Sequence, residues 1–546
     1  MKKYNFSVKT ALAVFAVVLS ACSSDNDIVD NNSNNQEKPV AGKTMTFHAS
    51  MDGDGDNATR TDFNGNNTEN NTVWATGDAI SILNKASVPN EEDIDSLAEF
   101  GITDGIGTKE ADFEGGPIRA NGEDNDQFYA FYPSSCFNPD SMKMIGNIPT
   151  VQTAMDKTYD QSLHFMTAYS TNTTFAFKNA CALLKITLNG NSTDNSNPVC
   201  RVKVVANPTL INVYDSLFQY TSIAGDFEAT VNDKGIATAT PKETKKTYVE
   251  LRASANDATA KTSLGNGTFY MVVLPATISN GFTLLLEKTD GTIYQRINTN
   301  ITSFGRNQMI NLGSYNCSST PTGMTALGND VVDLDLPSGT IWCKKNVKIS
   351  TKSALGVTYS WYVDGFVNTE EDYGDYFSFG KTHVPAQYNT PSLEQQTLKT
   401  SDDAVYQYDP KYCTPIFAQI FELFKFGPYT TVTSSLTGLG GARFEVANGR
   451  YLWLPYGGHY AAGLNVGLKI LEGDGEEAAY WSRTDIGTGF GVVSYKDAYC
   501  LDLKDDNGVP VVVPQENGRH FWSDDRQGGR NIRPVITNIK IAPIFE

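Results

Sequence analysis

The chain is long, acidic and moderately apolar, and these properties exclude several classes of function. It has 546 residues, of which 40% are hydrophobic, and a formal net charge of −19. Because no basic patch interrupts this acidity, we expect no nucleic-acid partner and no attraction to anionic membrane surfaces. The length suggests about three domains, each with its own core.

Residues 1–21 have the pattern of a secretory signal. Lys2 and Lys3 form a short basic head, and the uncharged run Ala11 to Leu19 that follows is too short to span a bilayer permanently. Small residues at the two positions before Cys22 resemble a lipobox, in which the cysteine is acylated and becomes the mature N-terminus. We therefore expect lipidation of Cys22 and a permanent membrane anchor. The alternative is an ordinary signal peptide with an incidental cysteine.

Residues 22–43 are rich in Asn and Ser and contain few residues able to build a core, so we expect a disordered tether. The sequence Ser-Asp-Asn-Asp at 24–27 also resembles the acidic signal that sends Bacteroidales lipoproteins to the outer face of the cell. The expected location is thus the outer membrane, lipid-anchored and facing outward.

Apart from Cys22, the chain has seven cysteines, none of which forms a CxxC pair or matches the spacing of a zinc site. We expect neither a metal site nor a cofactor. Buried thiols acting as small apolar side chains are the favoured interpretation, and a Cys181–Cys200 disulfide formed after export is the alternative.

Short alternating or apolar segments bounded by turn residues recur along the chain, and they predict a mainly β protein. The predicted strands are 44–49, 79–83, 127–132, 182–188, 202–206, 269–274, 282–287 and 308–312. A helix is predicted at 415–426, with Phe417, Ile420, Phe421 and Phe424 on one face and Gly427-Pro428 as its stop. Residues 317–329 have the composition of a flexible linker.

From about residue 44 to 316, an ordered series of short motifs resembles the fimbrillin family of Bacteroidales, the Mfa-like surface and pilus subunits. The motifs are Thr46 to Ala49, Ala58 to Thr61, Val73 to Ile80, Ala111 to Gly115, Phe128 to Pro133, Phe175 to Leu184, Gly225 to Phe227 and Arg306 to Gln308. The resemblance implies two transthyretin-like β-sandwiches, at 44–168 and 169–316.

The fimbrillin resemblance also implies assembly by β-strand addition, in which a protease removes the first strand and a neighbouring subunit fills the groove. Carried over to this chain, Thr46 to Ala49 is the removable strand, Arg60 is the candidate cleavage site and Thr61 is the new N-terminus. The alternative is that Arg60 is a loop arginine that is never cut.

Residues 330–546 resemble the major paralogous domain of surface proteins from Fibrobacteres and Bacteroidetes. The motifs are Val332 to Cys343, Tyr373 to Lys381, Asn448 to Pro455, Ala479 to Thr484 and Asn531 to Val535. The resemblance implies an α+β module of the C-type-lectin-like or formylglycine-generating-enzyme-like kind, a fold that hosts binders and oxidases alike.

We find no catalytic residues in this module, since it has no nucleophile elbow and no cysteine pair in an oxidase motif. Tyr456, His459, Tyr460 and Trp481 lie among glycines and are the candidate ligand-binding residues, because exposed aromatic rings can stack on sugars or pack against a protein. The alternative is that the aromatic residues belong to the core.

The sequence therefore predicts a non-enzymatic surface lipoprotein that acts in cell adhesion, as an accessory or tip subunit of a fimbrium (pilus) whose last module binds an external ligand. The expected partners are the outer membrane through the lipid, other fimbrial subunits, and a glycan or protein on a host or bacterial surface. Two alternatives stay open: a glycan-capturing outer-membrane lipoprotein of a nutrient-uptake system, and an enzyme on the lectin-like fold.

Overall fold

A computed structural model describes the chain in separate ranges. They are 43–51, 73–87, 96–120, 126–192, 196–212, 217–257, 261–348, 363–377, 403–426, 429–433, 440–446, 449–460, 471–474, 477–485, 497–506, 509–512, 523–525 and 530–536. The expected lipidation site Cys22 and the expected cleavage site, Arg60 and Thr61, lie outside the described residues.

Strands dominate the described residues, which confirms the mainly β class. The eight segments predicted as strands overlap β1 (Lys43–Ser50), β2 (Ala79–Asn84), β5 (Phe128–Tyr132), β12 (Ala182–Asn189), β13 (Val199–Ala206), β19 (Gly267–Val273), β21 (Phe282–Lys288) and β24 (Met309–Asn316). The described helices are α1 (Ala404–Tyr408), α2 (Phe417–Phe426) and short 3₁₀ turns. None of them is long and apolar enough to cross a membrane.

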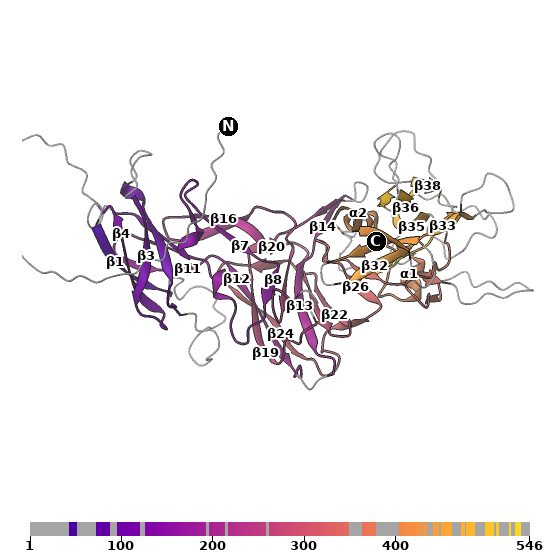
Figure 1. The fold of residues 1–546 in the computed structure, drawn as a ribbon, viewed down its shortest axis with the longest axis horizontal. Helices are drawn as coiled ribbons and strands as arrows, with labels where there is room; N and C mark the ends of the chain where they lie inside the picture. Colours follow the sequence, from indigo (N-terminus) through magenta and orange to yellow (C-terminus); the bar gives the residue numbers. More distant parts are fainter. Residues whose placement is uncertain are drawn as a thin grey trace, which may run out of the picture. The chain divides into compact units, whose positions relative to one another are not determined.

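The first part of the described chain forms one eight-stranded sheet that curls around its own core. Its order is β10-β1-β4-β3-β2-β5-β9-β11, with β10 (Thr174–Ala176), β4 (Glu110–Ile118), β3 (Leu97–Asp104), β9 (Met166–Ser170) and β11 (Lys178–Asn179) (Figure 1). Only Phe177 separates β10 from β11 in the chain, so the two ends of the sheet meet. Phe47, Trp74 and Phe113 are fully buried inside it.

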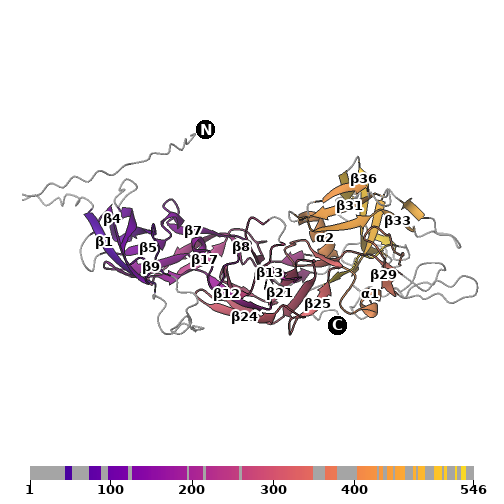
Figure 2. The same cartoon turned by 60° about the horizontal axis from the view of Figure 1, so that its bottom comes forward.

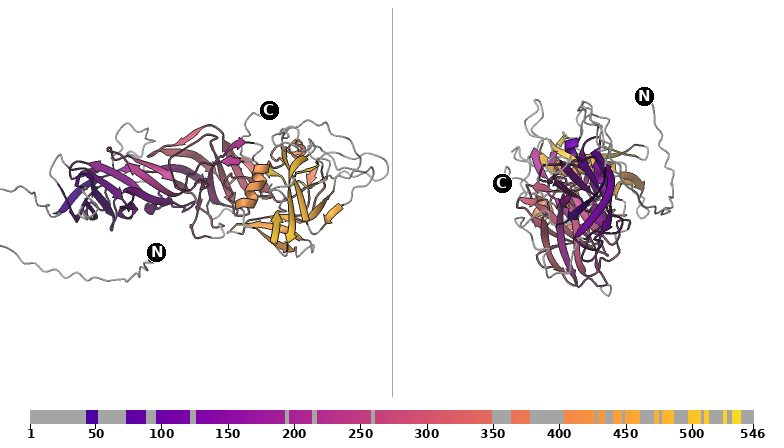
Figure 3. Two further views of the ribbon diagram at one scale, coloured as in Figure 1. Left: turned by 90° about the horizontal axis from the view of Figure 1, so that it is seen from above. Right: turned by 90° about the vertical axis from the view of Figure 1, so that its left-hand side faces the viewer.

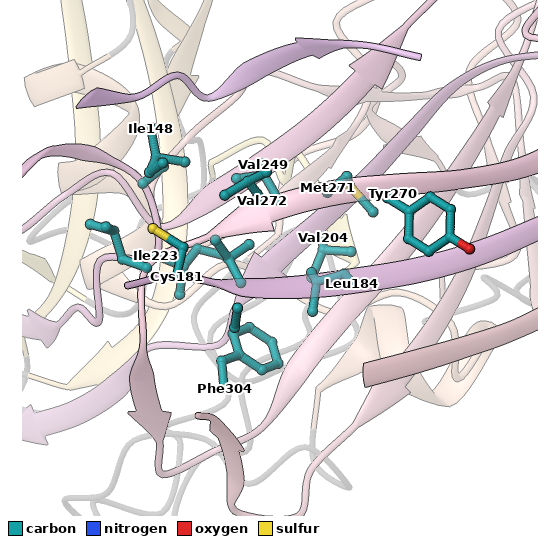
Figure 4. Close-up of a cluster of buried hydrophobic side chains, with 14 of the residues drawn as sticks. Ile148, Cys181, Leu184, Val204, Ile223, Val249, Tyr270, Met271, Val272 and Phe304 are labelled. Atoms are coloured by element: carbon teal, nitrogen blue, oxygen red, sulfur yellow. The ribbon is translucent and has the colours of Figure 1, made fainter. Parts of the chain in front are cut away.

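A second group of sheets encloses the largest core. Three strands pair in the order β19-β12-β24, and six in the order β25-β22-β21-β13-β18-β8, with β25 (Thr325–Gly328), β22 (Ile293–Asn298), β18 (Tyr248–Arg252) and β8 (Val151–Thr153). Four more follow the order β17-β16-β7-β6, with β17 (Ala237–Pro241), β16 (Gly225–Val231), β7 (Lys143–Ile148) and β6 (Phe137–Asn138). Leu184, Val204 and Met271 meet in this core (Figure 4).

Strand pairing crosses the domain boundaries that the sequence suggested. β7 and β8, inside the expected first sandwich, pair with β16 and β18, whereas β10 and β11, inside the expected second sandwich, complete the first sheet. Within the expected linker 317–329, Thr325–Gly328 form β25, which pairs with β22, so these four residues belong to the sheet. Local composition marks turns, but pairing between distant strands decides which sheet a segment joins.

The C-terminal part contains small sheets and both α-helices. The sheet orders are β26-β27-β39, β28-β29, β30-β31-β32 and β34-β33-β35-β36-β37, with β38 on β36. Their bounds are β26 (Val331–Asp333), β27 (Ile341–Cys343), β39 (Val535–Ile536), β28 (Val347–Lys348), β29 (Gly365–Phe366), β30 (Tyr429–Thr433), β31 (Gly440–Glu445), β32 (Tyr451–Pro455), β33 (Gly457–Tyr460), β34 (Leu471–Asp474), β35 (Glu477–Asp485), β36 (Asp497–Asp506), β37 (Val509–Val512) and β38 (Ser523–Asp525). Figures 2 and 3 show α2 as a coiled ribbon among these strands.

The helix predicted at 415–426 is confirmed as α2, but its buried face is different. Phe417 and Ile420 are buried as expected, while Phe421 and Phe424 are only half-buried. The buried set includes the polar side chain Glu422 instead. The predicted stop at 427–428 lies outside the described residues.

The six-stranded sheet is covered on both of its faces, and this fixes the C-terminal part against it. On β13, Val202 and Val204 face the large core, and Arg201 and Lys203 alternate with them toward the opposite side. On the neighbouring β21, Leu285 belongs to a core that the C-terminal strands supply. Every residue of β13 is therefore buried.

Candidate functional site

The structure corrects the expectation that Tyr456 and Trp481 present exposed rings. Both side chains are only 1% exposed. The Trp481 indole N–H donates to the Phe377 carbonyl at 2.6 Å, and the Arg530 guanidinium lies 5.2 Å from the ring. The two rings act as core residues, and neither can stack on a ligand from solvent.

His459 and Tyr460 complete the predicted set of ligand-binding residues. Their backbone belongs to β33, which pairs with β34, while their side chains lie outside the part of the chain that the structure describes. The predicted site is therefore not assembled by the described side chains, and its two fully described members serve the core.

A buried network of ion pairs joins the six-stranded sheet to the C-terminal part. Arg201 on β13 donates to Glu250 at 2.9 Å, to Glu287 at 2.8 Å and to Asp333 at 2.9 Å. The Lys203 ammonium lies 2.8 Å from Asp333 and 2.6 Å from Asp335. One strand of the sheet, β13, thus supplies both cations that pair with the two carboxylates at the start of the C-terminal part.

Arg450 closes this network from the C-terminal side. Its guanidinium donates to the Asp335 carboxylate at 2.6 Å and to the Asp333 carbonyl at 2.7 Å. Arg252 adds a further cation, donating to Glu250 at 2.7 Å. The network now contains four cations and four carboxylates, which balance one another.

The surrounding charges keep the buried network ionised. Burial by itself would raise the pKa of Asp333, but Lys203 and Arg201 oppose it and hold that pKa well below its usual range. Burial likewise disfavours the charged form of Arg201, yet Glu287, Asp333 and Glu250 raise the pKa of this guanidinium above its usual value. Buried ion pairs whose charges compensate one another stabilise the fold and are not poised to transfer protons.

A second polar contact of the C-terminal part is centred on Glu422 of α2 and reaches Tyr220, which follows β15 (Leu217–Gln219) in a separate two-stranded sheet with β14 (Thr209–Asn212). This side chain is 1% exposed and accepts hydrogen bonds from the Tyr220 hydroxyl at 2.9 Å and from the Ser338 N–H at 2.7 Å. Beside it, the Thr247 hydroxyl donates to the Pro337 carbonyl at 2.6 Å. Burial raises the pKa of Glu422 to about 7, although its hydrogen bonds oppose the shift.

A small pocket of about 190 Å³ opens beside the ion-pair network. Glu287, Asp333, Arg450 and Tyr451 contribute to its walls. Three of these residues are already engaged in ion pairs, and the volume is below the range of about 300–1,000 Å³ that is usual for ligand clefts. The pocket can therefore admit only a small group.

The described thiols are not activated for chemistry. The seven cysteines other than Cys22 are buried and free, so the structure contains no Cys181–Cys200 disulfide. Burial raises the pKa of Cys181 to about 12 and that of Cys413 to about 11, which leaves little thiolate at neutral pH. Among the described residues, no group of three or more His, Cys, Asp and Glu side chains is arranged to hold a metal ion.

Sequence reasoning missed the ion-pair network and Glu422. One signal was available: β13 reads Val-Cys-Arg-Val-Lys-Val-Val-Ala, so two cations alternate with apolar residues in an otherwise apolar strand. The run Val332 to Leu336 alternates in the same way, with Asp333 and Asp335 between apolar residues. Two strands with opposite charges at alternate positions are candidates for a buried ion-paired interface. Glu422 gave no such signal.

Comparison with known proteins gives distant structural similarity to cell-adhesion and fimbrial proteins of Bacteroides. A putative cell adhesion protein from Bacteroides uniformis is 15% identical with a TM-score of 0.31, covering 52% of this chain and 97% of that chain. A fimbrial protein from Bacteroides ovatus is 11% identical with a TM-score of 0.19, covering 85% and 95%, respectively. No protein family and no curated protein matches the sequence. These values assign the chain to no family and transfer no function.

Proposed function

We propose that the chain is a non-catalytic surface protein that is exported as a lipoprotein and acts in adhesion, as an accessory or tip subunit of a fimbrium, once cleavage after Arg60 has removed the anchor at Cys22. The observation that carries this proposal is the position of β1. This strand lies between β4 and β10, and its pairing with β4 extends from Lys43 to Ser50. An N-terminal strand inserted between two others is the geometry that strand exchange between subunits requires.

The core around β1 indicates what its removal would leave. Phe47 and Ala49 are fully buried, and the Phe47 ring lies 5.1 Å from Phe100, 5.1 Å from Phe128 and 5.2 Å from Phe175. Without β1, these rings would line an apolar groove bordered by the free backbone groups of β4. A donated strand with an aromatic residue at the Phe47 position would refill it.

The C-terminal part is the proposed ligand-binding module, and its attachment to the rest of the chain supports this role. An adhesin passes tension from its ligand to its anchor, so the binding module must be joined firmly to the rest. Here β25 and the ion-pair network connect this part to the six-stranded sheet, and the Glu422 contact connects it to Tyr220, next to the strand Leu217–Gln219.

The test is the mature N-terminus of the protein, isolated from the surface of cells that express it. We expect Thr61 as the first residue and fimbrial subunits that co-purify. Arg60→Ala should retain β1 and reduce incorporation into fimbriae, whereas the matched control Arg60→Lys, which a trypsin-like protease still cleaves, should behave as the wild type. A sole start at acylated Cys22 with no co-purifying subunit would reject strand exchange and favour capture of glycans by a stand-alone lipoprotein.

A further inference from the structure

Glu422 differs from the other carboxylates at the junction between the C-terminal part and the strands that precede it. Asp333 and Asp335 each contact cations, whereas all the hydrogen bonds that Glu422 accepts come from uncharged donors. They are the Tyr220 hydroxyl on one side of the junction and the N–H and hydroxyl of Ser338 on the other. Its carboxyl group therefore links the two sides without a compensating charge.

The charged groups near Glu422 do not neutralise it. Lys245 is the cation that acts on it electrostatically, and its ammonium lies 4.3 Å from the Phe426 ring rather than in an ion pair with the carboxylate. Burial also raises the pKa of Tyr220, so this hydroxyl stays neutral. The strand β35, which packs against α2, carries the cation Arg483. The backbone N–H of Arg483 donates to the Pro415 carbonyl, and its charge acts on Asp403. The described side chains of β36 at this core are Leu501 and Leu503.

The surrounding hydrogen bonds suit both protonation states of Glu422. When it is ionised, one carboxylate oxygen accepts from Tyr220 and the Ser338 N–H, and the other accepts from the Ser338 hydroxyl. When it is protonated, that second oxygen can donate to the Ser338 hydroxyl, which then donates onward to Thr340, 2.6 Å away. Only the hydroxyl hydrogens must turn. The neutral form is favoured because the loss of hydration that burial imposes outweighs both the hydrogen bonds to the carboxylate and the charge of Lys245.

We propose that Glu422 is a pH-sensitive contact. When protonated, it holds the turn 337–340 and α2 against Tyr220, the residue that follows the strand Leu217–Gln219, and when ionised it weakens this contact. This inference does not depend on the proposed adhesion role. The folded-state pKa of about 7 lies above the ordinary value of 4.5, so the stabilisation is complete below pH 4.5 and decreases as the pH rises toward 7. From the pKa of 4.5 in the open state and of about 7 in the closed state, the equilibrium constant for opening of this contact should be roughly 25-fold larger at pH 8 than at pH 5.5.

The test is hydrogen exchange of the full chain at pH 5.5 and pH 8, corrected for intrinsic exchange rates. In the wild type, protection of 337–340 and α2 should decrease about 25-fold between these pH values. Glu422→Gln, which approximates the protonated shape, should remove the dependence. The matched control is Glu228→Gln, in a pair with Lys143 where both side chains are about one-third exposed, and it should change neither segment.

A second variant separates a titrating contact from a merely structural one. Tyr220→Phe removes one donor to the ionised carboxylate, so it should shift the midpoint of the pH dependence upward rather than abolish it. The proposal is overturned if protection of α2 in the wild type does not vary with pH, or if Glu422→Gln retains the wild-type dependence. The wild-type profile alone decides the matter if a variant fails to fold.

Discussion

Asp333→Asn tests whether the buried ion pairs act as one unit. The cations of this network are Arg201, Lys203, Arg252 and Arg450, and its carboxylates are Glu250, Glu287, Asp333 and Asp335. The asparagine side chain has nearly the same shape, so packing is preserved. The change leaves one positive charge in excess where neither Lys203 nor Asp333 has any exposed surface.

The expected cost of this substitution is large. Asp333 lies 2.9 Å from Arg201 and 2.8 Å from Lys203, so both cations lose a charged partner. Breaking a buried pair by removing one partner typically costs about 3–5 kcal/mol, because the other charge stays buried without compensation. Asp333→Asn combined with Lys203→Met restores neutrality, and we expect the double variant to lose less stability than the sum of the two single changes.

Urea denaturation at pH 7, followed by tryptophan fluorescence, measures the free energy of unfolding, since Trp342 and Trp481 lie in the C-terminal cores. Glu228→Gln in the partly exposed pair with Lys143 is the matched control and should leave the unfolding midpoint unchanged. The reasoning is refuted if Asp333→Asn costs no more than this control, or if the double variant is additive.

Three further predictions concern other parts of the molecule. Phe47→Ala should lower the free energy of unfolding of the first sheet by about 3–5 kcal/mol, measured by urea denaturation, and a loss below about 1 kcal/mol would contradict the buried position of the ring. Burial lowers the pKa of His164 from 6.5 to about 4. The contribution of this side chain to the free energy of unfolding is therefore complete above pH 6.5 and is lost as the pH decreases toward 4. Urea denaturation at several pH values should show a loss of about 3 kcal/mol, which should be absent in His164→Gln. A fragment of residues 325–546 should not unfold cooperatively in calorimetry, because Asp333 would lose Arg201 and Lys203 and keep only its longer pair with Arg450; a sharp transition would disprove this.

Local patterns in the sequence predicted individual elements well. Alternation on β12, where buried and half-buried residues follow one another, comes directly from the period of a strand with one core-facing side. The helix α2 was predictable from Phe417 and Ile420, although the burial of Glu422 reverses the polarity expected at that position. The period of the apolar residues shows which face of a segment can be buried. It does not show which polar side chain will find hydrogen-bond partners on another element.

The arrangement of strands and the candidate site were much less predictable. Composition placed a linker at 317–329, but β25 within it completes an edge of the six-stranded sheet. Glycine-rich surroundings suggested that Tyr456 and Trp481 were exposed, whereas neighbouring strands bury both rings. For β25 and Trp481 the deciding contact comes from residues more than twenty positions away, about which a local pattern carries no information.

Attachment through a sheet face has a direct consequence for how the C-terminal part can present a ligand site. A flexible linker of the length of 317–329 would let its ends separate by roughly 20 Å, so the module would sample many orientations. In this structure, β25 and the pairs of Arg201 and Lys203 with Asp333 fix that connection. Tension applied to the module must break buried ion pairs before it straightens the segment. A binding site on this module would therefore meet its ligand in one orientation, which lowers the entropic cost of binding. Under tension, the contacts of the junction would break before the segment 317–329 is stretched.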